Sequence, residues 1–96
     1  MRMMVTIRIP VEAGSRTIKD GTLPQVTQKI LEYIKPECVY FFLENGKRTM
    51  RAFFEMKHAG DMVPAFEPAM MQFDAEVELI PCMNAEDLKS GLQAIG

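Results

Sequence analysis

The dipeptide Asn45-Gly46 constrains the fold of this chain more than any other part of its sequence, because it joins two apolar, aromatic-rich runs. The first run is 39–43 (VYFFL) and the second is 49–56 (TMRAFFEM). A tight hairpin turn requires positive φ angles, which glycine adopts freely and asparagine tolerates. Residues 39–56 are therefore predicted to form a β-hairpin, and the other elements are placed around it.

Two further segments alternate between apolar and polar residues, which is the period of a β-strand. Residues 2–9 place Met3, Val5, Ile7 and Ile9 on one side, and Pro10 ends the run. Residues 75–82 alternate in the same way, and Pro81 suggests an edge strand, since proline cannot donate a hydrogen bond to a neighbouring strand. With the hairpin, the chain has four predicted strands.

Helical signals fill the intervals between these strands. A short helix is expected over 12–19, followed by one that begins at Thr22 as N-cap and ends before Pro36. Another is expected after Asp61, with Pro68 kinking or dividing it. Asn84 is predicted to cap a last helix, whose narrow apolar seam of Leu88, Leu92 and Ile95 suits contact with a partner subunit.

The composition, with 96 residues of which 48% are hydrophobic and 25% charged, indicates one globular domain spanning residues 1–96. The order strand, helix, strand, strand, helix, strand predicts an α+β, ferredoxin-like fold with an appended C-terminal helix. Its four-stranded antiparallel sheet is expected in the order 4-1-3-2, with helices on one face only. The expected core under those helices is Val5, Ile7, Ile9, Val39, Phe41, Leu43, Met50, Ala52, Phe54, Met56, Val77 and Leu79.

The same alternation assigns a mixed set of residues to the other face of the sheet: Met4, Thr6, Arg8, Cys38, Tyr40, Phe42, Thr49, Arg51, Phe53, Glu55, Glu76, Glu78 and Ile80. Its apolar members would expose a patch larger than monomers usually tolerate. A domain this small also buries only about 60–65% of its unfolded surface, which favours oligomers. We therefore expect a homodimer in which two sheets pack through these faces and enclose a cavity.

The element order, and the segment from Phe53 to Met83 with its closing run 75–80 (AEVELI), resemble the dimeric α/β-barrel superfamily. The layout is similar to that of muconolactone isomerase-like proteins. It also resembles bacterial groups of that superfamily, with 9–12 (IPVE) and 83–88 (MNAEDL) as the distinctive segments. The resemblance implies a dimeric barrel. Superfamily members that act as monooxygenases or degrade haem use cavity Trp, Asn or His residues, and this chain has no tryptophan, so those activities are not implied.

Six residues are candidates for chemistry in the cavity or at its mouth: Arg8, Tyr40, Arg51, Glu55, Glu78 and His58. One interpretation pairs Arg8 with Glu76 across neighbouring strands to fix the dimer register. The alternative is that Arg8 or Arg51 binds a carboxylate ligand while Tyr40 donates a hydrogen bond and a glutamate moves a proton. His58, the only histidine, is either a general base at the cavity mouth or a solvated loop residue.

These readings give two function hypotheses. The first is a dimeric barrel that binds a small organic acid or aromatic between its sheets. The second is a cofactor-free enzyme of isomerase or oxygenase type that uses the Arg, Tyr and Glu residues of the cavity. Neither hypothesis calls for a cofactor or a metal ion, because one histidine and two distant cysteines offer no zinc site.

Charge and cysteine content bear on the partners and the location. A formal charge of −2 with scattered basic residues gives no reason to expect nucleic acid. No run approaches the ~18 apolar residues of a membrane helix, and the N-terminus does not resemble a secretory signal, so a cytoplasmic location is expected. Cys38 and Cys82 are expected roughly 14 Å apart, at opposite sheet edges, as free thiols.

Overall fold

The computed structural model describes all 96 residues and contains four strands, four α-helices and one 3-10 turn. In chain order the elements are β1 (Arg2–Ile9), α1 (Val11–Lys19), α2 (Thr22–Ile34), β2 (Cys38–Glu44), β3 (Lys47–Glu55), η1 (Ala59–Asp61), α3 (Met62–Phe73), β4 (Glu76–Pro81) and α4 (Ala85–Gln93). The predicted hairpin is β2-β3. Asn45 and Gly46 have φ angles of 52° and 78°, the positive values that its tight turn requires.

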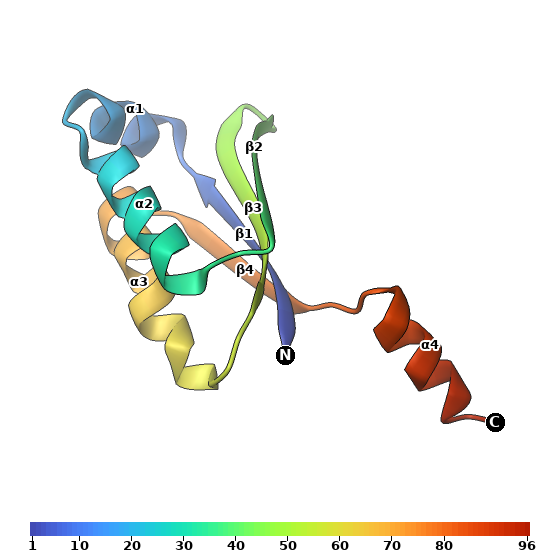
Figure 1. Ribbon diagram of the computed structural model, residues 1–96. Coiled ribbons are helices and arrows are strands. Elements are labelled where there is room, and N and C mark those ends of the chain that lie inside the picture. Colours follow the sequence, from blue (N-terminus) through green and yellow to red (C-terminus); the bar gives the residue numbers. More distant parts are fainter.

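The four strands form one antiparallel sheet in the order β2-β3-β1-β4, which is 4-1-3-2 when read from the β4 edge. In the central strands Val5 faces Ala52 on one side and Leu79 on the other. Helices α1, α2 and α3 all lie against the same side of the sheet (Figure 1). The molecule is therefore an α+β, ferredoxin-like domain, with β2 and β4 as edge strands.

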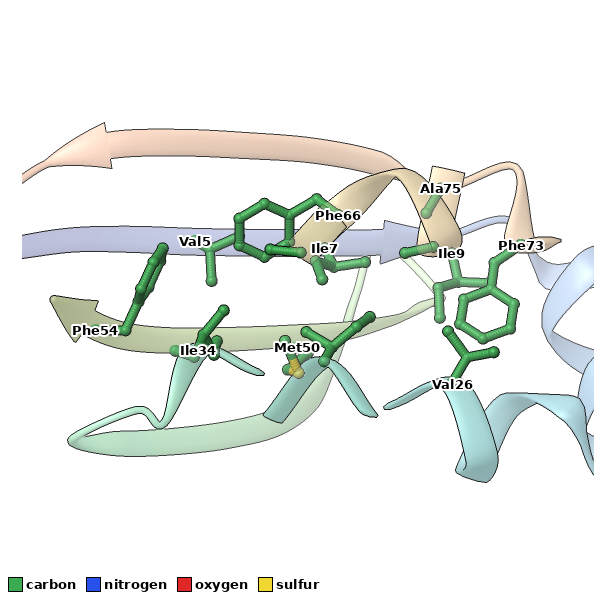
Figure 2. Packing of buried hydrophobic residues seen from close by; sticks show 14 of the residues in the cluster. Val5, Ile7, Ile9, Val26, Ile34, Met50, Phe54, Phe66, Phe73 and Ala75 are labelled. Carbon is green, nitrogen blue, oxygen red and sulfur yellow. The ribbon is translucent and has the colours of Figure 1, made fainter. Parts of the chain in front are cut away.

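The core lies between the sheet and α2 and α3, with a contribution from α1. Figure 2 shows Val5, Ile7 and Ile9 from β1 pointing toward the helices. The rings of Phe54 on β3 and Phe66 on α3 meet edge to face, with centroids 5.8 Å apart. Phe73, at the end of α3, is 1% exposed. The helix-facing residues of the central strands β1 and β3 are thus buried, as the strand alternation predicts.

The prediction of burial is wrong for two residues of β2. Phe41 and Leu43 are 60% and 73% exposed, although both lie on the helix-covered side of the sheet. The physical reason is that β2 is an edge strand, and the turn end of the hairpin lies away from α2 (Figure 1). The alternation predicts which side of the sheet a residue faces. It does not predict how far the helices extend over that side.

Two helix starts and one helix interior bear on the remaining helix predictions. Gly21, with φ 82°, precedes α2 in place of a Thr22 cap, and the Asp20 carboxylate accepts the Thr22 backbone N–H at 2.8 Å. A left-handed residue is needed there because α1 and α2 are joined by a two-residue turn. Asp61 does not cap α3 through its side chain. Of the two predicted effects of Pro68, a kink or a division, the division is not found, because α3 continues through this residue.

Helix α4 projects away from the rest of the domain, so the molecule measures 55 × 28 × 17 Å (Figure 1). As predicted, Asn84 caps it, with its Oδ1 accepting the Asp87 backbone N–H at 2.8 Å. Its base is held by an ion pair between Arg2 Nη1 and Asp87 Oδ2 at 2.7 Å. None of its residues is buried, and the Leu88, Leu92 and Ile95 seam faces solvent. No helix of this chain is long and apolar enough to span a membrane.

Candidate functional site

The side of the sheet away from the helices, here called the open face, collects most of the candidate residues. Its apolar members include Tyr40 and Ile80, which are 63% and 44% exposed, and the half-buried Met4, Phe42 and Phe53. They come from all four strands. The open face therefore combines a broad apolar surface with the charged residues described next.

Four charged side chains, one from each strand, are joined into one network on the open face, here called the Glu44 network. Arg8 Nε on β1 donates to Glu44 Oε1 on β2 at 2.6 Å, and Arg8 Nη1 donates to Glu78 Oε1 on β4 at 2.9 Å. Arg51 Nη2 on β3 donates to Glu44 Oε2 at 3.5 Å. Two guanidinium groups are thus balanced by two carboxylates.

Arg51 is held by two neighbours besides Glu44. Its Nε donates to Thr6 Oγ1 at 3.0 Å, which gives that 2% exposed side chain a hydrogen-bond partner. Its guanidinium carbon also lies 5.0 Å from the centroid of the Phe42 ring, a cation–π arrangement. These contacts hold the Arg51 side chain in place on the open face.

The network shifts the pKa values of two of its members. The hydrogen bond from Arg8 lowers the pKa of the Glu44 carboxyl below its ordinary value, and the positive charges of Arg8 and Arg51 add to this effect. The hydrogen bonds to Glu44 and Glu78 raise the pKa of Arg8 above its ordinary value. Both shifts stabilise the charged forms of Glu44 and Arg8.

The predicted Arg8–Glu76 pair is not formed. Arg8 faces Glu76 in the register of β1 and β4, yet its guanidinium bonds to Glu44 and Glu78. Glu76 lies instead 3.9 Å from Lys47 Nζ. An arginine side chain is long enough to contact residues that lie diagonally opposite on a neighbouring strand. Two charge-assisted hydrogen bonds to such residues outweigh one pair with the directly opposite residue.

Glu44 is the site residue that the sequence reasoning missed. It lies between the apolar run 39–43 and Asn45, in the segment that joins the two strands of the predicted hairpin. The signal that could have found it is the alternation of β2 itself, because Glu44 continues the row formed by Tyr40 and Phe42 on the open face.

The structure brings together Arg8, Arg51 and Glu78 of the six predicted candidates. Tyr40 lies directly across from Arg51 in the β2-β3 register but makes no side-chain hydrogen bond. Glu55 is at the opposite end of β3, where it pairs with the N-terminal amine of Met1. His58 is exposed in the loop after β3, and its backbone N–H donates to Asp61 Oδ2 at 3.2 Å. Glu55 and His58 therefore lie outside the Glu44 network.

Both cysteines are free thiols, Cys38 on edge strand β2 and Cys82 just after edge strand β4. They lie at opposite edges of the sheet, as predicted from the strand order.

The comparisons with known proteins support the fold and do not bear on the function. No protein-family model matches the chain, and no curated protein matches it. Among solved structures, the chain is similar to a formyltetrahydrofolate deformylase from Pseudomonas putida KT2440, with a TM-score of 0.56 and 17% sequence identity. The match covers 85% of this chain but only 29% of the deformylase chain. At this identity the likeness shows a shared domain fold, and it bears neither on the muconolactone isomerase-like layout nor on a dimeric barrel.

Proposed function

We propose that this protein is a homodimeric binding domain in which two open faces pack together and enclose a cavity for a small aromatic or organic acid. The observation that carries the proposal is the composition of the open face, where exposed apolar side chains lie beside a charge network that is already neutralised within the chain. The exposed apolar residues favour contact with a second copy. The paired charges remove the main obstacle to burying that face.

The apolar argument rests on Tyr40 and Ile80. Large apolar side chains exposed near one another on a single face are typical of interaction surfaces. Tyr40 is on β2 and Ile80 on β4, so the exposed apolar area extends from one sheet edge to the other. An area that spans all four strands matches a sheet-on-sheet interface better than a narrow ligand groove.

The charge argument rests on the Glu44 network. Burying an unpaired charge is strongly unfavourable, whereas a hydrogen-bonded set with balanced charge enters an interface at much lower cost. Because Arg8 and Arg51 already bond to carboxylates of the same chain, their role on this face is structural. Of the two ligand classes, the cavity between the sheets is then better suited to an aromatic molecule, held by rings such as Tyr40 and Phe53.

Helix α4 supplies a further apolar surface to the proposed dimer. Its Leu88 and Leu92, together with Ile95 just beyond its C-terminal end, are 49% to 84% exposed and are not covered by this chain. A projecting amphipathic helix is suited to packing on a neighbouring subunit.

The dimer is tested with the variant Ile80→Glu, which places a charge on the open face. Met71→Glu is the matched control, because Met71 is 70% exposed on α3, on the helix side of the molecule. We expect wild type and Met71→Glu to sediment as dimers and Ile80→Glu as a monomer. A monomeric wild type, or loss of the dimer in both variants alike, would contradict the proposed interface.

The ligand class is tested with phenol and cyclohexanol, which differ in the aromatic ring. A cavity walled by aromatic side chains should bind phenol more tightly, measured by calorimetry or by ligand-detected NMR. Ile80→Glu should lose this preference together with the dimer. Equal binding of the two probes to the dimer would refute the aromatic part of the proposal.

A further inference from the structure

A pocket on the helix side of the sheet is not part of the proposed dimer interface. An apolar pocket of about 360 Å³, here called the hairpin pocket, opens between α2, α3 and the inner side of β2-β3. Ten of its thirteen lining residues are hydrophobic, among them Leu23, Ile30, Phe41, Leu43, Met50 and Phe73. Its volume falls within the range of small-molecule sites, about 300–1,000 Å³.

Phe41 and Leu43, the two exposed residues of β2, both line this pocket. Both are largely exposed, and removing apolar surface of this size from water is favourable. In the isolated chain neither residue gains this stabilisation. An apolar occupant of the pocket would bury both residues at once.

Arg48 is the only charged residue that lines the pocket. Arg2, Arg8 and Arg51 each have a carboxylate oxygen within 3.5 Å, whereas Arg48 forms no ion pair. Its guanidinium makes two long hydrogen bonds to α1, from Nη1 to Val11 O at 3.3 Å and from Nη2 to Ser15 Oγ at 3.4 Å. Because a guanidinium has five N–H donors, Arg48 has the capacity to bind an anion.

Gly14 on α1 makes the position of Arg48 possible. A Cβ atom built at Gly14 would lie 2.6 Å from Arg48 Nη1 and 3.2 Å from Arg48 Cδ. Any larger residue would therefore displace the arginine from the helix surface. The close packing of Gly14 against Arg48 therefore holds a guanidinium with unused N–H donors beside the hairpin pocket.

We infer that the hairpin pocket binds an amphiphilic monocarboxylate, with its apolar chain against Phe41, Leu43 and Ile30 and its carboxylate on Arg48. An arginine fork matches the two oxygens of a carboxylate, and a single cation balances a single negative charge. The inference rests on the proposed role of the chain as a binding domain. It does not depend on the dimer, because most residues that line the pocket, including Phe41, Leu43 and Arg48, lie on the helix side of the sheet.

The test measures binding of octanoate to the full chain by calorimetry and by amide NMR, with octylammonium as the probe of equal chain length and opposite charge. We expect octanoate to shift the amide signals of β2, Arg48 and α2, and octylammonium to bind far more weakly. Equal binding of the two probes, or octanoate-induced shifts confined to the open face, would overturn the assignment.

The matched variants are Arg48→Gln and Arg16→Gln. Arg16 is also free of a carboxylate partner and lies on α1, but its Nη2 bonds to Gln72 O and it does not line the pocket. Losing a charge-assisted contact should weaken octanoate binding roughly tenfold or more in Arg48→Gln and leave it unchanged in Arg16→Gln. An equal loss in both variants would indicate a general charge effect and refute the site.

Two more outcomes separate this inference from the proposed dimer. Octanoate binding should survive in Ile80→Glu even when that variant is monomeric, and its loss there would contradict a site away from the interface. If Phe41 and Leu43 become protected as the chain is concentrated without octanoate, the occupant is a second copy of the chain, and the inference is wrong.

Discussion

Glu44 links the two arginines of the open face, since its oxygens accept from both Arg8 and Arg51. Removing its charge leaves these guanidinium groups with fewer acceptors, while Arg8 keeps Glu78 and Arg51 keeps Thr6. Glu44 is therefore the single position at which the network can be weakened without removing a cation.

We predict that Glu44→Gln lowers the free energy of unfolding at neutral pH and that this difference from wild type disappears in acid. The folded-state pKa of Glu44 is lowered, so its stabilising contribution is complete above the ordinary carboxyl pKa of about 4.3. It is lost as the pH falls through the lowered folded-state value. The effect should be small, because both partners are partly exposed.

Denaturant unfolding at a series of pH values measures this difference. Glu67→Gln on α3 is the control, because Glu67 forms no ion pair. A Glu44→Gln deficit that persists unchanged below pH 3 would contradict the electrostatic account.

At the level of single residues, the sequence predicts which face a side chain occupies but not its partners. Arg8 lies on the open face as expected, yet its partners are Glu44 and Glu78 and not the directly opposite Glu76. Partner choice depends on side-chain length and on diagonal distances across the sheet, which the alternation does not encode.

Among the elements, the β2-β3 turn and the α4 cap were predictable because each is decided by neighbouring residues. Asn45 and Gly46 supply the turn φ angles, and Asn84 supplies the α4 cap. The exposure of Phe41 and Leu43 was not predictable in this way. It depends on how far the helix layer extends over β2, which is a property of the tertiary packing.

Removing residues 85–96 should leave the domain folded and weaken its dimer. No residue of α4 is buried, so the core loses nothing, and the main interaction lost is the exposed Arg2–Asp87 ion pair. Amide NMR of the truncated chain should retain the dispersed signals of the sheet, and sedimentation should show a higher dissociation constant.

Asp87→Asn is the control for the truncation, since it removes the ion pair with Arg2 and keeps the apolar seam. This variant should dimerise like wild type. An unfolded truncated chain would show that α4 contributes to the core, contrary to its position in Figure 1.

Over the whole molecule, the strand order followed from the sequence because four strand signals and two interposed helical regions leave few arrangements of one sheet. The assembly does not follow in the same way. A dimer depends on how two surfaces fit, and the hairpin pocket exists only because a helix layer stops short of an edge strand. Both properties belong to the packed domain and not to a local pattern.

A dimer that is the stable folded form makes thermal stability depend on protein concentration, because dilution favours dissociation and unfolding by mass action. Wild type should therefore gain roughly a few degrees of melting temperature for each tenfold rise in concentration. Ile80→Glu should melt at the same temperature at every concentration, and Met71→Glu should follow wild type. Scanning calorimetry across a wide concentration range measures this dependence. A concentration-independent wild type would mean that the open face is stable in water without a second copy, which would remove the basis of the proposed interface.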